Sequence, residues 1–390
     1  MTIPEAQPNR RGRFSLVLAL VVAAVLALLS AAVMVPPESM ALFPLVIGAS
    51  EMSPFLVLLD LLWCLAAFRL LRGRPNLRSA TIVILVLSGI IAVRPLTRFT
   101  RAAADASRQL GTGALPPRFS LLDAVRGLPV HGDVTERAIH YTAADSSPLV
   151  MRTFAQPAHA VQPAVVVIYG GAWRGGDASQ CANVSRSLAS LGYVVIAIDY
   201  RHAPRNRFPA ELDDIRRSLA VIRDSATAWR IDTRRIALLG RSSGGHLAEL
   251  ASYSPGDIPP RAVVAIYAPY DLVQGYTDLP SPDPIGVRQV LTDFIGGSPR
   301  EFPVRYHSAS PASFVHPGLP PTLILFGGRD HVVKPEFNRR ATSDLRAAHV
   351  PVVSVELPWA EHGFDMAPAG LGAQLAFFTI SEFLDRELRH

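Results

Sequence analysis

The sequence is poor in the residues that would indicate a disulfide scaffold or a metal centre. It contains two cysteines, Cys64 and Cys181, and among its basic residues only Lys334 is a lysine. Cys64 lies in an apolar stretch and Cys181 in the more polar C-terminal part, so we expect no disulfide between them. Neither has a neighbouring cysteine or histidine at metal-ligand spacing, and the sequence therefore predicts no metal site.

The positive charge of the chain does not indicate a nucleic-acid-binding protein. The net charge is +6 and the isoelectric point is near 9.7. Residues 1–132 carry 13 arginines against 6 acidic residues, whereas the rest of the chain carries 25 basic and 26 acidic residues. The excess of positive charge therefore lies in residues 1–132, beside apolar stretches, as is typical of arginines that flank membrane spans. We therefore expect a membrane and no nucleic acid as a partner.

Three apolar stretches within residues 1–93 are candidates for transmembrane helices. Residues 14–35 carry no charge and, as a helix, are long enough to cross a bilayer core of about 30 Å. This run exceeds a typical signal core, so we expect a retained span rather than a cleaved signal peptide. Residues 54–71 contain Asp60, which is functional, solvated or paired within the helices. Residues 80–93 are short for a full span, although Arg78 and Arg94 at their ends could extend them.

The distribution of arginines predicts the orientation of these spans. Residues 10–13 hold three arginines, residues 36–53 hold none, and four lie between the second and third spans: Arg69, Arg72, Arg74 and Arg78. With three spans, this pattern places the N-terminus in the cytoplasm and the C-terminal domain outside. Arg94, Arg98 and Arg101 favour the opposite orientation, and with two spans the domain would be cytoplasmic.

Residues 94–132 form a predicted linker that contains several glycines and prolines. Within it, apolar residues fall on one face of a short helix: Phe119, Leu121, Leu122, Val125 and Leu128. This face either packs against the following domain, which we favour, or lies on the membrane.

From residue 133 to residue 390, apolar strands alternate with helices. We expect strands at residues 138–142, 149–154, 164–169, 193–198, 236–239, 262–268, 322–326 and 352–357, and helices at residues 180–191, 210–223, 336–348 and 371–388. Fully apolar strands that alternate with helices are typical of an α/β domain with a mainly parallel sheet and helices on both faces. Residues 269–320, which are rich in proline and glycine, form a long insertion.

A candidate nucleophile lies in the segment Gly240-Arg241-Ser242-Ser243-Gly244. A short apolar strand precedes this G-x-S-x-G motif and a helix-forming run follows it, which is the arrangement of a nucleophile elbow. Glycines two residues on either side of Ser242 leave room for neighbouring backbone in the tight turn. Ser243 lacks this spacing, so we assign the nucleophile to Ser242.

A serine hydroxyl needs a histidine to take its proton and a carboxylate to hold that histidine. Asp330 follows the expected strand 322–326, and His362 follows the expected strand 352–357. Both stand in loops at the carboxyl ends of strands and follow the serine in the order Ser, Asp, His. His331 is less suited as the base because it adjoins Asp330, and Asp271 is the alternative acid.

An oxyanion hole also requires backbone N–H groups that point at the reacting oxygen. The N–H of Ser243 stands at a helix N-terminus, where such groups have no helical partner. The glycine-rich loop after the strand 164–169 supplies further donors, and we nominate the N–H groups of Gly171 and Ala172.

These residues carry a resemblance to a known family. Residues 133–390 resemble the hormone-sensitive-lipase-like and feruloyl-esterase-like carboxylesterases of the α/β-hydrolase superfamily. The matching motifs are Gly170-Gly171-Ala172-Trp173, Asp199-Tyr200-Arg201 with Pro204 and Phe208-Pro209-Ala210, Gly240 to His246, Gly328 to Asp330, and His362-Gly363. The chain departs from this family at Tyr169, where the loop usually begins with histidine, and residues 1–93 have no counterpart in its soluble members.

The resemblance implies hydrolysis of carboxylic esters, of small acyl or lipid-like type, without a cofactor. We therefore expect a membrane-anchored serine esterase in which Ser242, His362 and Asp330 form the triad. An acyltransferase or a peptidase would use the same residues, and a non-catalytic scaffold is less favoured because the triad is complete. We expect the insertion to shape the acyl pocket, with Tyr276, Phe294 and Phe302 as candidate lining residues; the sequence identifies no protein partner.

Overall fold

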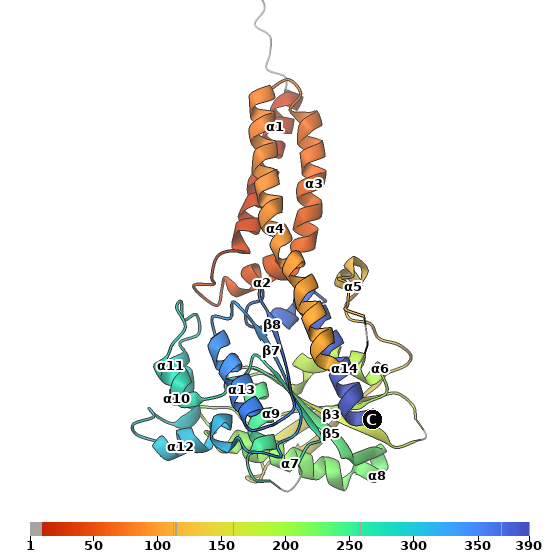
Figure 1. The fold of residues 1–390 in the computed structure, drawn as a ribbon, viewed down its shortest axis with the longest axis vertical. Helices are drawn as coiled ribbons and strands as arrows, with labels where there is room; N and C mark the ends of the chain where they lie inside the picture. The colour runs from red at the N-terminus through yellow and green to blue at the C-terminus, as the bar shows by residue number, and fades with distance from the viewer. Residues whose placement is uncertain are drawn as a thin grey trace, which may run out of the picture.

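The computed structural model describes residues 10–389 apart from residues 112, 114, 159, 257, 258 and 368. Residues 1–9 and the side chains of Arg10, Arg11 and Arg13, which entered the charge argument above, lie outside the described part. A column of helices stands on one end of an α/β domain (Figure 1). The column is formed by α1 (Arg10–Ala32), α3 (Ser53–Leu70) and the first part of α4 (Pro75–Leu110).

The helical column contains the three stretches that the sequence marks as candidate spans. Among the described residues, Phe14–Ala32, Ser53–Leu70 and Pro75–Leu110 are long and apolar enough to cross a membrane, by length and composition. The third stretch is not limited to residues 80–93, because α4 continues well beyond both ends of that run. A short helix that the sequence did not predict, α2 (Phe43–Glu51), connects α1 to α3 at the base of the column (Figure 1).

Asp60 is paired inside the column. Its Oδ2 lies 2.9 Å from the hydroxyl of Ser88, and that hydroxyl lies 2.8 Å from the hydroxyl of Ser30. The three side chains come from α3, α4 and α1, and each is at most 3% exposed. The contacts agree with the helix-paired interpretation of Asp60, since polar groups between apolar helices stabilise their association.

The predicted linker differs from the structure in its first half, because α4 runs unbroken through Pro95 to Leu110. Its lower part has an apolar stripe at helical spacing that packs against the α/β domain: Phe99, Ala102, Ala103, Ala106 and Leu110. Burial of this stripe compensates for the hydrogen bond that proline cannot donate within a helix. The helix ends at Gly111, whose φ of +65° is readily adopted only by glycine.

The second half of the predicted linker contains the expected short helix, α5 (Leu121–Arg126). Its position is fixed, because the side chain of Gln374 bonds to both the N–H and the carbonyl of Ser120, each at 2.8 Å. Leu121, Leu122 and Val125 are nevertheless 46%, 55% and 74% exposed. Phe119, from the same apolar face, packs edge-on against the buried Phe99, so the alternative that we favoured holds for only part of the face.

The α/β domain is built on one mainly parallel sheet, as the sequence predicts. Among the described residues the strands lie in the order β1-β2-β4-β3-β5-β6-β7-β8, and only the β1–β2 and β2–β4 pairs are antiparallel. The strands are β1 (Thr135–Thr142), β2 (Pro148–Ala155), β3 (Gln162–Ile168), β4 (Val194–Ile198), β5 (Ile231–Arg241), β6 (Ala262–Ile266), β7 (Thr322–Gly327) and β8 (Val352–Leu357).

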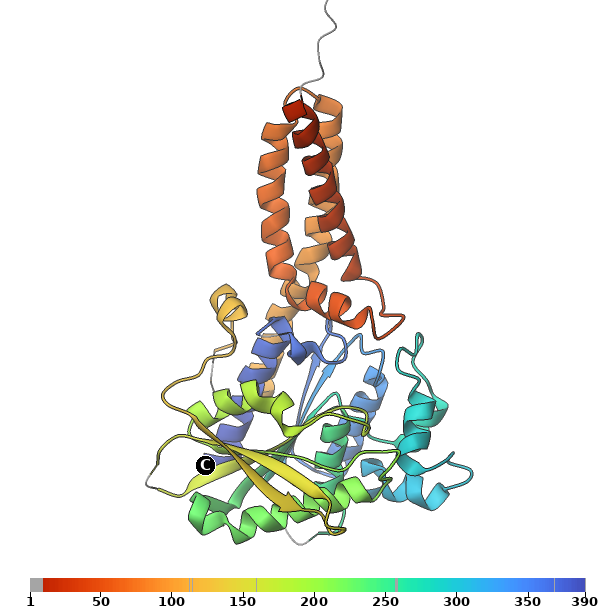
Figure 2. The same cartoon turned by 180° about the vertical axis from the view of Figure 1, so that it is seen from behind.

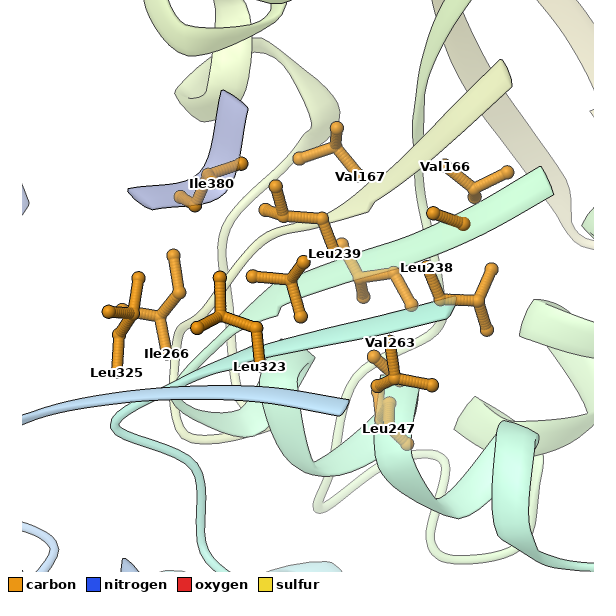
Figure 3. Packing of buried hydrophobic residues seen from close by; sticks show 14 of the residues in the cluster. Val166, Val167, Leu238, Leu239, Leu247, Val263, Ile266, Leu323, Leu325 and Ile380 are labelled. Carbon is orange, nitrogen blue, oxygen red and sulfur yellow. The ribbon is translucent and has the colours of Figure 1, made fainter. Parts of the chain in front are cut away.

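Helices cover both faces of this sheet (Figures 1 and 2). On one face lie α6 (Ala182–Ser190) and α14 (Leu371–Arg389); on the other lie α7 (Ala210–Asp224), α9 (Ser243–Tyr253) and α13 (Pro335–Ala347). Figure 3 shows Leu247 of α9 and Ile380 of α14 approaching the central strands from opposite sides. The fully buried central strands agree with a sheet that is covered on both faces.

The insertion after β6 folds into short helices rather than a loop. They are α10 (Leu272–Thr277), α11 (Val287–Ile295), α12 (Pro303–Ser308) and the 3₁₀ turn η2 (Pro311–Phe314); elsewhere the chain adds η1 (Ala178–Cys181), α8 (Ala226–Trp229) and η3 (Phe364–Met366).

The last part of α4, below the helical column, meets the sheet at β8, the edge strand. The side-chain amide of Gln109 in α4 donates to the carbonyl of Ser354 at 2.8 Å and accepts from its N–H at 3.0 Å. A glutamine thus replaces a neighbouring strand at this position and protects part of an otherwise open edge. The lower half of α4 is in this way a component of the α/β domain.

Candidate active site

Ser242 stands at the sharp turn between β5 and α9. Its backbone has φ +51° and ψ −123°, a conformation that costs energy for a residue with a side chain. A Cβ added to Gly240 would lie 2.1 Å from the carbonyl oxygen of Gly244, and one added to Gly244 would lie 2.3 Å from that of Ile168. Only glycine fits at both positions, for the steric reason inferred from the sequence.

The three residues predicted as a triad meet at the carboxyl ends of β5, β7 and β8. The Nε2 atom of His362 lies 2.9 Å from Ser242 Oγ, and its Nδ1 atom lies 2.8 Å from Asp330 Oδ2. Asp330 is fixed through its other oxygen, Oδ1, which accepts the backbone N–H groups of Val332 and Val333 at 2.8 Å each. The side chain of Asp330 is fully buried, and that of His362 is 14% exposed.

The two alternative residues lie outside this chain of hydrogen bonds. Asp271 caps α10, where its Oδ1 accepts from Val273 and Gln274, and it pairs with Arg340 at 3.0 Å. His331 Nδ1 lies 2.7 Å from Oε1 of Glu361, a fully buried carboxylate, and this hydrogen bond raises the pKa of His331. The residue after Asp330 is thereby tied to the residue before His362.

The His362 loop is also held from the side of the nucleophile elbow. Arg241 Nε lies 2.7 Å from Asp365 Oδ2, and the hydroxyl of Tyr267 donates to the other oxygen of Asp365. The ring of Tyr267 lies 4.4 Å from the His362 ring, centroid to centroid. Arg241 adjoins Ser242 and Asp365 follows His362 by three residues, so this ion pair fixes the distance between the two segments.

The nominated oxyanion loop lies beside Ser242, and its three N–H groups are not equivalent. The N–H of Gly171 donates to the hydroxyl of Ser243 at 3.0 Å. Within the described part of the chain, the Ala172 N–H makes no hydrogen bond, and the Ser243 N–H lies in the first turn of α9, where it has no partner within the helix. Ala172 and Trp173 have φ of +54° and +57°, so the loop is held in a strained conformation.

Two side chains hold this loop. The hydroxyl of Tyr169 donates to Asp199 Oδ1 and lies 2.8 Å from His202 Nε2, so the residue that departs from the family pattern connects the loop to the end of β4. Trp173 Nε1 donates to His246 Nδ1 at 3.2 Å, and His246 Nε2 lies 2.7 Å from the Ala309 carbonyl. Burial lowers the pKa of His246 to about 4, which leaves its Nδ1 free to accept.

An apolar pocket opens beside Ser242. The insertion supplies most of its wall, as predicted, and the lining residues are Ala172, Trp173, Ser242, Ser243, Pro269, Asp271, Leu272, Gly275, Pro280, Ile285, Val287, Val290, Leu291, Val332, Val333 and Phe337. The three aromatic candidates are absent from this lining. Phe294 stacks under Trp173 at 4.3 Å, Tyr276 packs on Tyr306, and Phe302 lies against Arg305.

Sequence reasoning missed the residues that support the triad rather than form it. Tyr267, Glu361 and Asp365 act through contacts between distant segments, and their only sequence signal is proximity to a predicted strand end or to His362. Among the described residues no group of three or more histidine, cysteine or acidic side chains is arranged to hold a metal ion.

Comparison of the sequence with known proteins shows that the chain is similar to esterases. Residues 154–345 match the model of the family described as BD-FAE. The chain is 32% identical over 238 residues to the probable carboxylic ester hydrolase LipM of Mycobacterium tuberculosis, covering 57% of this chain and 54% of LipM. It is 34% identical over 223 residues to esterase LipC of the same organism, covering 52% and 53%. The chain thus spans about half the length of the curated relatives it matches.

Solved structures show the same fold. An esterase of Pyrobaculum calidifontis has a TM-score of 0.58 at 21% identity, over 75% of this chain and 92% of that structure. A bacterial heroin esterase has a TM-score of 0.58 at 22% identity, over 76% and 93%. These likenesses show that the chain has the α/β-hydrolase fold, and the sequence matches show that it is similar to carboxylesterases of the hormone-sensitive-lipase-like kind.

Proposed function

We propose that the protein is a membrane-anchored serine esterase that hydrolyses carboxylic esters through an acyl-enzyme. The observation that carries this proposal is the unbroken hydrogen-bonded chain from Ser242 through His362 to Asp330, at the edge of an apolar pocket. The relatives named as esterases support the same chemistry.

In this mechanism Ser242 Oγ attacks the ester carbonyl while His362 Nε2 takes its proton. Asp330 orients the ring and stabilises the imidazolium. The carbonyl oxygen becomes negative and is stabilised by the N–H groups of Ala172 and Ser243, which need no reorganisation at that moment. His362 then protonates the leaving alcohol, and water repeats the sequence to release the acid.

We place the acyl group of the substrate in the apolar pocket, on the side formed by α10 and α11. Its walls are mainly aliphatic, and the one carboxylate that reaches it, Asp271, is neutralised by Arg340. An ester with an uncharged acyl chain fits this lining better than a charged acid. The similarity to relatives named as esterases favours an esterase over a peptidase, and an acyltransferase would need an acceptor other than water at the same site.

Membrane anchoring is supported by the surface of the helical column. Apolar side chains on its outside are strongly exposed, among them Phe14 at 71%, Leu28 at 72% and Leu65 at 66%. Such a surface is stable in lipid and not in water. We place α5 at the membrane surface, because this helix lies on the side of the domain that carries the column (Figures 1 and 2) and its Leu122 and Val125 are exposed.

Replacement of Ser242 by alanine tests the nucleophile. Ser242→Ala is expected to abolish ester turnover and labelling by a fluorophosphonate probe, since loss of a triad member costs about 10⁴ to 10⁶ in rate. Ser243→Ala is the matched control and should retain both, because it keeps the backbone N–H of residue 243 and removes only a hydroxyl that contacts the Gly171 N–H and the Tyr200 hydroxyl. Undiminished labelling of Ser242→Ala would overturn the assignment.

The acid and the base are tested by two pairs of variants. Asp330→Asn and His362→Ala should each lose most of kcat while the protein stays folded, whereas Asp271→Asn and His331→Ala should lose far less. The reason is that Asp330 and His362 belong to the hydrogen-bonded chain that ends at Ser242, whereas Asp271 and His331 lie outside it. Steady-state kinetics with a p-nitrophenyl ester measures this, and equal damage from Asp271→Asn in a folded protein would contradict it.

The orientation of the catalytic domain is tested by reporter fusions. We propose that three spans place the domain outside the cytoplasm. The contact from Arg329 to the carbonyl of Val33 supports an odd number of spans, because it places the end of α1 on the same side as the domain. The arginines before the first span and between the second and third spans favour a cytoplasmic N-terminus, and so a domain on the opposite side. Alkaline phosphatase fused after Gly132 should be active, and green fluorescent protein fused there should be dark. Bright fluorescence with inactive phosphatase would put the domain in the cytoplasm.

A further inference from the structure

Helix α2 lies outside the candidate spans and packs against the segment that carries His362. A Cβ added to Gly363, the residue after His362, would lie 3.7 Å from the Cδ1 atom of Ile47. The last residue of the helix, Glu51, is 1% exposed. A carboxyl group buried to this extent requires partners, and those that it has come from the α/β domain.

Both oxygens of Glu51 accept hydrogen bonds from that domain. Oε1 accepts from the indole Nε1 of Trp359 at 3.1 Å, and Oε2 accepts from the backbone N–H of Gly372 in the first turn of α14. Trp359 precedes His362 by three residues and Gly372 follows it by ten. One side chain of the membrane-proximal helix therefore joins the two ends of the loop in which the catalytic histidine stands.

The start of α14 is shaped to admit this carboxyl group. A Cβ added to Gly370 would lie 2.8 Å from the Cβ of Glu51, and one added to Gly372 would lie 2.9 Å from its Oε2. Two glycines thus allow a close approach that any other residue would prevent. The carboxyl group also lies at the N-terminus of a long helix, where backbone N–H groups have no helical partner and need an acceptor.

Other contacts between the two parts converge on the same loops. Arg98 of α4 donates to the carbonyl of Pro358 at 3.1 Å, and Arg329, the residue before Asp330, donates to the carbonyl of Val33. The loops of the proposed acid and base are therefore both held from the side of the helical column. Among these contacts, those of Glu51 are the buried ones.

We propose that Glu51 is a positioning residue that sets the conformation of the His362 loop and so makes the membrane region part of the active site. The inference rests on the proposed esterase function. Glu51 does not touch Ser242, His362 or the apolar pocket. It acts by fixing Trp359 relative to Gly372, and a displacement of His362 by about 1 Å costs up to about a hundredfold in rate.

This role predicts an effect on kcat without an effect on KM. Glu51→Gln is nearly isosteric, but its amide can accept only one of the two N–H groups and presents a donor to the other. In full-length protein in detergent micelles, we expect kcat for p-nitrophenyl acetate to fall at least about tenfold while KM changes less than about twofold. The rate of fluorophosphonate labelling should fall with kcat, because both reactions need His362 to activate Ser242.

Glu38→Gln is the matched control, since Glu38 is an exposed carboxylate of the same membrane-proximal segment, and it should leave both constants unchanged. Trp359→Phe removes the indole donor from the other side of the contact and should reproduce the loss in kcat. The kcat of the double variant should be no lower than that of the more impaired single variant, because both changes break the hydrogen bond between Glu51 and Trp359.

A folded Glu51→Gln protein with the kcat of the wild type would overturn the proposal, as would equal changes in kcat and KM or additive effects in the double variant. If Glu51→Gln shows no thermal unfolding transition, the variant is not folded. The kcat and KM of Trp359→Phe then test the proposal by the same criteria. Failure of the proposed function is distinguishable, because the wild-type protein would then hydrolyse no ester.

Discussion

The conformation of Ser242 is the constraint on which the rest of the site depends. Its positive φ costs about 1–3 kcal/mol and persists only because the surroundings leave no alternative. Gly240 and Gly244 admit the neighbouring backbone at distances that no side chain would tolerate, and the hydrogen bond from the Ser242 N–H to the carbonyl of Ile266 at 2.9 Å ties the turn to β6. The strain is compensated by the buried strands on either side, and its result is an exposed hydroxyl beside a helix N-terminus.

The proposed nucleophile is useful only if the proposed base is equally fixed, and contacts from three directions fix the loop of that base. Arg241 and Asp365 connect the elbow to the histidine loop, His331 and Glu361 connect the acid loop to it, and Glu51 holds it from the membrane side. All three contacts use buried or half-buried carboxylates, whose loss would leave unpaired groups behind. The helical part of the chain is thereby joined to the loops of the proposed acid and base.

The parts of the fold that follow from local rules could be predicted from the sequence. Apolar strands, the helices between them and the elbow glycines are local patterns, and the order Ser242, Asp330, His362 follows from strand ends. Helix α2 and Glu51 could not be found in this way, because their partners lie more than 300 residues away. The continuation of α4 past Pro95 was missed because burial against β8 outweighed the proline. The hydrogen bond from the Gly171 N–H to the Ser243 hydroxyl depends on the side-chain rotamer of Ser243, which a sequence pattern does not specify.

The most direct test of the account is the site of covalent modification by a p-nitrophenyl N-alkylcarbamate, whose carbamoyl-enzyme breaks down slowly. The account predicts release of about one equivalent of p-nitrophenol, parallel loss of esterase activity, and a carbamoyl group on Ser242 in the tryptic peptide that begins after Arg241, found by fragmentation mass spectrometry. Inactivation with the carbamoyl group on Ser243 or on any other residue would contradict it.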